Sequence, residues 1–204
     1  MTRIQCPPEM IPHVKQVIAG EYDLPGYPKT DPIILDIGAN VGSFAIWALF
    51  RWPKAIVYCY EPNPDNFAYL KENLKNIHPD KTYNLSNVAV GDPTKNKLYL
   101  GKHNCGECSL YDVGEQQENY IDVLTVDPST LPPAHILKID TEGSEIDILK
   151  RLDVNGYDAI TLEFHSEKDR RKIDKILKKF VAVRGYIRTK DRGVISYLNV
   201  NSSL

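Results

Sequence analysis

The sequence predicts an α/β domain with a mostly parallel, doubly wound sheet of the Rossmann-like kind. Short aliphatic runs alternate with amphipathic stretches whose apolar residues recur at helical spacing. A glycine-containing loop follows the first aliphatic run, as in nucleotide-binding α/β units. The length of 204 residues suits one such domain with a substantial core.

The elements follow one another in the βαβ rhythm that brings strands into parallel pairing. Pro64 is suited to the first turn of a helix, and Asn63 before it is suited to the N-cap. The predicted strands are 33–37, 55–60, 82–90, 135–139, 157–164, 186–189 and 194–200, the last of them antiparallel. The predicted helices are 43–50, one beginning at Pro64 and reaching Ile77, 144–152 and 168–180.

Two regions depart from this rhythm. Residues 93–125 carry short apolar runs between Gly, Asn and Asp, which predicts a small antiparallel β elaboration. Residues 1–32 are rich in proline and hold one short apolar-periodic stretch near 11–18. We therefore divide the chain into an N-terminal segment, 1–32, and a Rossmann-like domain, 33–204.

Composition excludes several classes of protein. The formal net charge is −2 and the pI about 6.2, so the chain has no global nucleic-acid footprint. No apolar run approaches the ~20 residues that span a bilayer, and no signal-peptide core follows Met1, so we expect a cytoplasmic protein. Cys105 and Cys108 form a C-x-x-C pair, which we interpret as a glycine turn rather than a metal or redox site.

The loop at 38–42 indicates the kind of ligand. Dinucleotide-binding loops follow the pattern G-x-G-x-x-G, whose second glycine lets the backbone approach a pyrophosphate. Here Asn40 takes that position and Ser43 the third, so the pyrophosphate site is missing. Glu61 follows about 20 residues later, where an acid binds a ribose. These features predict a nucleoside ligand without a diphosphate, such as S-adenosylmethionine, whose cationic groups suit nearby Asp36.

Four ordered motifs resemble those of FkbM-type methyltransferases. They are Asp-Ile-Gly-Ala-Asn-Val-Gly at 36–42, Tyr-Glu-Pro at 60–62, Asn-Val-Ala-Val-Gly-Asp at 87–92 and Leu-Lys-Ile-Asp-Thr-Glu-Gly at 137–143. A fifth stretch, Gly-Glu-Tyr-Asp at 20–23, resembles a segment that precedes the first motif in that family. The resemblance implies a Rossmann-like methyltransferase fold, S-adenosylmethionine and, most often, O-methylation. It also implies that Asn87 and Ala89 lie along the adenine and that Glu21 and Tyr22 fold over the cofactor.

Acidic residues and a histidine stand at the ends of two later strands. Asp140 ends one strand and Glu142 follows it, while Glu163 and His165 lie two apart, so both can face the ligand crevice. We predict Asp140, Glu163 and His165 as catalytic residues and assign no metal ligand. One alternative is that those three residues bind a divalent metal ion. Another is that Asp140 and Glu142 have only a structural role, in which Asp140 caps the turn or the following helix and Glu142 interacts with the positive end of the helix dipole. The predicted cofactor residues are Glu21, Tyr22, Asp36, Gly38, Asn40, Gly42, Ser43, Glu61, Asn63, Asn87, Ala89, Asp140 and Glu142.

The predicted function is methyl transfer from S-adenosylmethionine to a hydroxyl of a small molecule or sugar. The basic helix at 168–179 leaves RNA or another anionic acceptor as an alternative, although such a face is usually only solvated. A non-catalytic S-adenosylmethionine-binding module is the other alternative. The acids at the strand ends favour the enzyme. The sequence predicts no membrane partner and no particular oligomeric state.

Overall fold

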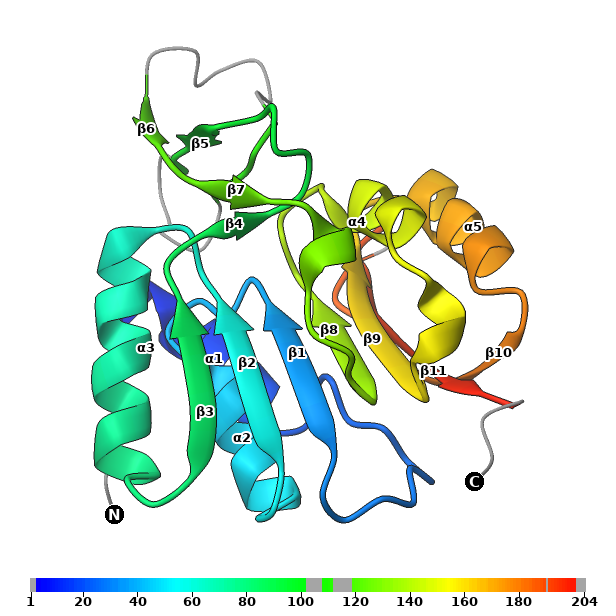
Figure 1. Ribbon diagram of the computed structural model, residues 1–204, viewed down its shortest axis with the longest axis horizontal. Helices are drawn as coiled ribbons and strands as arrows, with labels where there is room; N and C mark the ends of the chain where they lie inside the picture. The colour runs from blue at the N-terminus through cyan, green and yellow to red at the C-terminus, as the bar shows by residue number, and fades with distance from the viewer. Residues whose placement is uncertain (1–2, 102–107, 112–118, 190, 201–204) are drawn as a thin grey trace.

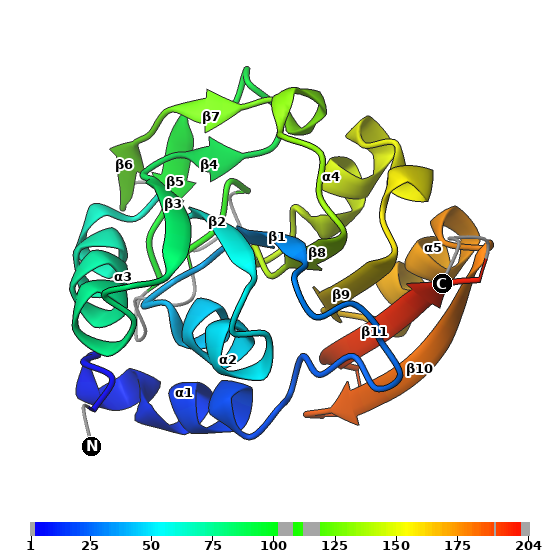
Figure 2. The same cartoon turned by 60° about the horizontal axis from the view of Figure 1, so that its bottom comes forward.

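A seven-stranded sheet with helices on both faces forms the centre of the computed structural model, which describes residues 3–101, 108–111, 119–189 and 191–200 (Figures 1 and 2). The strand order is β10-β11-β9-β8-β1-β2-β3. The strands are β1 (Ile33–Ile37), β2 (Ile56–Tyr60), β3 (Thr82–Ser86), β8 (Ile136–Ile139), β9 (Ala159–Phe164), β10 (Phe180–Ile187) and β11 (Gly193–Asn199). The first five pair in parallel, and β11 is antiparallel to both β9 and β10. The predicted mostly parallel sheet with an antiparallel terminal strand is confirmed.

In the part of the chain that the structure describes, five α-helices cover the sheet: α1 (Ile11–Ile18), α2 (Ser43–Arg51), α3 (Pro64–Ile77), α4 (Glu145–Arg151) and α5 (Glu167–Ile176). The side chains of β1 alternate between the two faces because successive residues of a strand point to opposite sides. Ile34 packs in one core cluster with Phe44 of α2, whereas Leu35 packs in a second with Ile148 of α4 and Ile173 of α5. The sheet is therefore doubly wound, as the sequence predicts.

The chain leaves the main sheet after β3, so the single strand predicted at 82–90 is wrong. The side-chain nitrogen Nδ2 of Asn87 donates to the backbone oxygens of Glu61 and Pro62, and the chain turns at this residue. Ala89 then donates its backbone N–H to the Leu124 carbonyl instead of to β2. The result is a separate two-stranded sheet, β4 (Ala89–Val90) with β7 (Thr125–Val126).

The described parts of the elaboration predicted at 93–125 lie above the carboxyl ends of β2 and β3 (Figure 1). The antiparallel prediction holds for β5 (Lys97–Tyr99) with β6 (Tyr120–Asp122), but β4 and β7 pair in parallel. Leu98 and Leu110 pack on Ala89 in a small core that belongs to this region. Cys105 lies outside the described residues, so the predicted turn between the paired cysteines is untested.

The last helix is shorter than predicted. α5 ends at Ile176 rather than 180, and β10 begins at Phe180 rather than 186. Leu177 takes a non-helical conformation and accepts a hydrogen bond from the Phe180 backbone N–H, after which Val181 and further β-favouring residues extend the strand. None of the helices in the described ranges has the length and apolar character needed to cross a membrane.

Candidate active site

A cavity of about 190 Å³ opens at the carboxyl ends of β1, β2, β8 and β9, where open α/β sheets bind ligands. Seven residues predicted for the site line it: Gly38, Asn40, Glu61, Ala89, Asp140, Glu142 and Glu163. The other predicted residues are not part of the lining: Glu21, Tyr22, Asp36, Gly42, Ser43, Asn63, Asn87 and His165. Lining residues that sequence reasoning missed include His13, Leu98, Arg188 and Arg192.

The glycine loop wraps the end of β1 in left-handed backbone. Gly38, Asn40 and Gly42 have φ angles of 77°, 52° and 88°, a region open to glycine and tolerated by asparagine. A Cβ at Gly38 would lie 1.7 Å from the backbone oxygen of Asp140. The loop therefore approaches the end of β8 as closely as a backbone can, and only glycine fits at the contact.

Glu61 at the end of β2 holds the loop from the other side. Its two carboxylate oxygens accept the backbone N–H groups of Asn40 at 2.8 Å and Asn63 at 2.9 Å. Burial raises the pKa of Glu61 to about 7, although these two hydrogen bonds oppose the rise. Asn63 in turn caps α3, since its side-chain oxygen accepts from the backbone of Asp65 at 2.9 Å. Each Glu61 oxygen still has an acceptor position for a ribose hydroxyl.

Beneath the cavity, Lys138 joins the ends of β1 and β8. It is the register partner of Asp36, and both side chains are buried. The Lys138 Nζ lies 3.0 Å from Asp36 Oδ1 and 4.0 Å from Asp140 Oδ2, and it donates to the Gly38 backbone oxygen at 2.6 Å. Asp36 thus faces Lys138 instead of the cavity. Burial raises the pKa of Asp36, with Lys138 opposing. At Asp140 burial acts in the same direction, but the charges of Lys138 and Arg188 and a hydrogen bond with Glu163 together outweigh it and hold the pKa well below its usual range.

The N-terminal segment reaches the site through two side chains. The Tyr22 hydroxyl donates to Asp140 Oδ2 at 2.6 Å. Buried Glu21 pairs with Arg188, Oε1 to Nε at 2.6 Å, and Arg188 also donates to Glu163. Arg188 follows β10, so this one guanidinium connects the beginning of the chain, the end of β9 and the β10–β11 hairpin.

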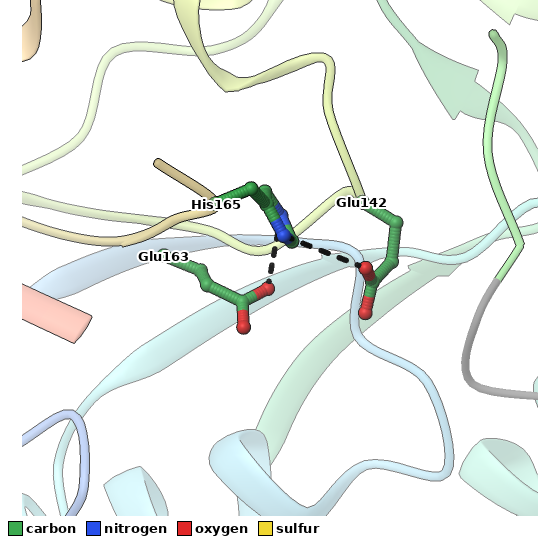
Figure 3. A group of neighbouring side chains, drawn as sticks. All are labelled: Glu142, Glu163 and His165. Carbon is green, nitrogen blue, oxygen red and sulfur yellow. Dashed lines mark ion pairs between the residues drawn. The ribbon is translucent and has the colours of Figure 1, made fainter. Parts of the chain in front are cut away.

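Glu142, Glu163 and His165 converge at the ends of β8 and β9 (Figure 3). One imidazole nitrogen of His165 lies 3.2 Å from Glu163 Oε2, and the other lies 3.9 Å from Glu142 Oε2. Burial and the neighbouring carboxylates raise the pKa of Glu142 to about 7 and that of Glu163 well above its usual value. The pKa of His165 is also raised, because Glu145 and Glu142 outweigh its burial. Glu163 faces the cavity as the two-residue spacing predicts, whereas His165, which we expected to face it too, is not a lining residue and contacts Glu163 instead.

The turn that carries Glu142 is fixed by Glu145 at the start of α4. Glu145 accepts the backbone N–H groups of Thr141 at 2.9 Å and Gly143 at 3.1 Å. Glu142 and Gly143 both have left-handed φ angles, 53° and 112°. The bonded turn therefore holds Glu142 in a conformation that a side chain rarely adopts.

This fold and this site define the class of Rossmann-like methyltransferases. Over residues 36–193 the chain matches the Methyltransferase FkbM domain, so the chain belongs to the FkbM methyltransferase family. The resemblance of its sequence motifs to that family is thereby confirmed.

Two curated relatives carry more detailed names. The hexuronic acid methyltransferase AglP of Haloferax volcanii is 26% identical over 155 residues, covering 73% of this chain and 62% of AglP. The 2-O-methyltransferase NoeI of Sinorhizobium fredii is 44% identical over 96 residues, covering 46% of this chain and 38% of NoeI. The chain thus spans less than two thirds of the length of either relative.

Solved structures agree on the fold. Methyltransferase FkbM from Methylobacillus flagellatus superposes with a TM-score of 0.63 at 17% identity, covering 94% of this chain and 50% of that one. M. capricolum TrmK, solved with S-adenosyl-homocysteine as the natural cofactor product, gives a TM-score of 0.50 at 13% identity, covering 92% and 68%.

Proposed function

We propose that this chain transfers the methyl group of S-adenosylmethionine to a hydroxyl of a small molecule or sugar. The observation that carries the proposal is one cavity lined both by Glu61 and the glycine loop and by Asp140 and Glu163. Glu61 and the glycine loop suit a nucleoside ligand, and Asp140 and Glu163 suit an acceptor that must lose a proton. The names of NoeI and AglP, a 2-O-methyltransferase and a hexuronic acid methyltransferase, support a sugar-like acceptor.

On the cofactor side, Glu61 binds the ribose hydroxyls and Ala89 lies along the adenine. Asn40 replaces the glycine that a pyrophosphate would need, which favours S-adenosylmethionine over NAD. Asp140, with its pKa held low, keeps a negative charge at the cavity wall that suits the cationic part of the cofactor. Glu21 and Tyr22 keep the N-terminal segment over this side of the site through Arg188 and Asp140.

Methyl transfer from a sulfonium is an in-line displacement. The acceptor oxygen forms a bond to the methyl carbon, the sulfur–carbon bond breaks, and the hydroxyl proton passes to a base. Asp140 orients the acceptor, and Glu163 or His165 takes the proton. Glu163 lines the cavity, while His165 lies behind it and contributes through their 3.2 Å contact. A raised pKa makes Glu163 a stronger base than an ordinary carboxylate.

Calorimetry with S-adenosylmethionine and with NAD tests the cofactor. We expect micromolar binding of S-adenosylmethionine or its demethylated product and none of NAD. Glu61→Ala should weaken that binding, since charge-assisted hydrogen bonds contribute about 1.5–3 kcal/mol each. Micromolar NAD binding without binding of S-adenosylmethionine would overturn the proposal.

Turnover of methyl-labelled cofactor with a panel of hydroxylated acceptors tests the reaction. Glu163→Gln and His165→Ala should each lower single-turnover rates by about 10²–10⁴-fold and leave cofactor affinity within a few-fold. If Asp140→Asn, Glu163→Gln and His165→Ala all keep wild-type rates, these catalytic assignments are wrong.

Adding RNA to the panel of acceptors tests the alternative that the methyl acceptor is RNA or another anionic molecule. Along α5, Arg170 and Arg171 pair with Glu167, and Lys172 pairs with Asp169. This internal pairing favours a solvated face over a docking surface. A binding module without catalysis would bind the cofactor and turn over no acceptor.

A further inference from the structure

The convergence of Glu142, Glu163 and His165 has the composition of a cation site. Each residue offers one ligand atom, and the three atoms lie within 4.8 Å of one another. Figure 3 shows both carboxylates pointing toward the imidazole, that of Glu163 at the end of β9 and that of Glu142 in the turn before α4. One nitrogen and two carboxylate oxygens form a donor set that suits Mn²⁺ or Zn²⁺.

A second observation points to a ligand in this place. Glu163 is 1% exposed, and its Oε2 makes no hydrogen bond to any residue in the described ranges, although Oε1 accepts from Arg188. His165 Nε2 lies 3.2 Å from Glu163 Oε2 and 3.7 Å from Glu145 Oε1, but at neither contact does the geometry complete a hydrogen bond. A buried carboxylate oxygen without a donor is costly, and a cation between these atoms would remove that cost.

The surrounding charges favour a cation as well. Glu145 lies 3.7 Å from His165, but both of its oxygens already accept backbone N–H groups of the turn. Asp140 is engaged by Tyr22 and Lys138, and Arg188 is shared between Glu163 and Glu21. Glu142 has no such cationic partner at hydrogen-bonding distance within the described residues. Arg192 lines the same cavity and acts on Glu142 by its charge, but the four carboxylates Asp140, Glu142, Glu145 and Glu163 still outnumber the three fixed cations Lys138, Arg188 and Arg192.

We propose that Glu142, Glu163 and His165 bind a divalent cation of the Mn²⁺ or Zn²⁺ class at the acceptor side of the cavity. Glu142 and Glu163 line the cavity, so the open coordination positions face the space where an acceptor would lie. A hydroxyl oxygen bound there would be more acidic, because the cation would stabilise the alkoxide, and its proton would pass to bulk water. This role rests on the proposed function and is the alternative to direct proton transfer to Glu163 or His165, because their ligand atoms would then be occupied by the cation.

Titration of the metal-free chain with Mn²⁺, followed by electron paramagnetic resonance, tests the site without turnover. We expect one Mn²⁺ per chain, with a nitrogen coupling from the imidazole. His165→Ala should abolish that coupling, and Glu142→Gln should weaken Mn²⁺ binding by at least about tenfold. Glu167→Gln removes an exposed carboxylate on α5 and is the matched control, which should bind Mn²⁺ as the wild type does.

Two results would overturn the cation site. One is the absence of stoichiometric binding of both Mn²⁺ and Zn²⁺, measured by calorimetry. The other is binding that neither His165→Ala nor Glu142→Gln changes. Circular dichroism of each variant excludes misfolding as the cause of a loss, and the nitrogen coupling reports His165 directly. S-adenosylmethionine binding in the presence of a chelator separates the two proposals, because the cofactor site survives there even if the cation site does not exist.

Discussion

The hydroxyl of Tyr22 donates to Asp140 Oδ2 at 2.6 Å, across 118 residues of sequence. Tyr22 is 1% exposed and lies edge-on to Phe44 of α2, so the ring is fixed as well as the hydroxyl. This bond connects the segment before β1 to the end of β8, at the wall of the cavity. The N-terminal segment is therefore in contact with the candidate catalytic residues.

Tyr22→Phe should lower stability by about 1.5–3 kcal/mol, since it removes a buried hydrogen bond to a charged group. It should also weaken cofactor binding, because Asp140 loses a group that orients it. Urea unfolding and calorimetry measure the two effects. Tyr27→Phe is a matched control, because its hydroxyl bonds Asp158 at 3.4 Å far from the cavity and should leave the cofactor affinity unchanged. Equal effects of the two substitutions on cofactor affinity would contradict this role of Tyr22.

The contact between Gly38 and β8 should not tolerate a side chain. In Gly38→Ala the new Cβ meets the backbone oxygen of Asp140, so the loop must move, and cofactor affinity should fall by at least about tenfold while strain costs about 1–3 kcal/mol. Gly42→Val should act in the same direction, with a Cβ 2.8 Å from Leu70 Cδ1. Gly156→Ala provides the control, because its Cβ would meet no atom within 4 Å. Unchanged cofactor affinity in Gly38→Ala would show that the loop does not hold the cofactor.

The sequence alone predicted those parts of the site whose positions depend on the spacing of residues within one strand or loop. The spacing from the glycine loop to Glu61 placed both on one cavity, and the two-residue period of β9 turned Glu163 toward the same cavity. A signal for Lys138 was also present, since a lysine inside an apolar strand needs a buried partner, and strand pairing made that partner Asp36.

Other site residues left no local signal. Arg188 meets Glu163 only because the antiparallel β10–β11 hairpin folds back beside β9, and that register depends on tertiary packing. His13 lines the cavity because α1 packs beside α2, which no short pattern indicates (Figure 2). The split of the 82–90 run depended in the same way on one side chain, Asn87, and its hydrogen bonds to the turn after β2.

Arg188→Met should destabilise the chain by about 3–5 kcal/mol, because it leaves the buried carboxylates of Glu21 and Glu163 without their cation. Arg188→Lys keeps the positive charge but loses the planar guanidinium group, so the stability of this variant should lie between those of the wild type and Arg188→Met. Arg184→Met, which removes a partly exposed pair with Asp23 at 4.0 Å, should cost about 0–1 kcal/mol. Urea denaturation compares the three. An Arg188→Met variant no less stable than Arg184→Met would mean that Arg188 does not neutralise these carboxylates.

The pKa of Glu61, raised by burial to about 7, gives stability and cofactor affinity opposite dependences on pH. The folded chain binds this proton more tightly than the unfolded chain does. The contribution of Glu61 to stability is therefore largest below pH about 4.5 and is lost as pH rises through about 7, by on the order of 2–3 kcal/mol. Ribose hydroxyls donate to the ionised carboxylate, so cofactor affinity should rise over the same interval.

Glu61→Gln has no proton to lose, so it should flatten both dependences and bind the cofactor weakly at every pH. Thermal unfolding and calorimetry from pH 5 to 8 on the wild type and this variant measure them. A wild-type affinity that falls as pH rises, or a pH dependence that Glu61→Gln leaves unchanged, would exclude the ionised Glu61 carboxylate as the ribose acceptor. The two backbone N–H groups that it already accepts, from Asn40 and Asn63, would then be its only function, and that function would be to shape the loop.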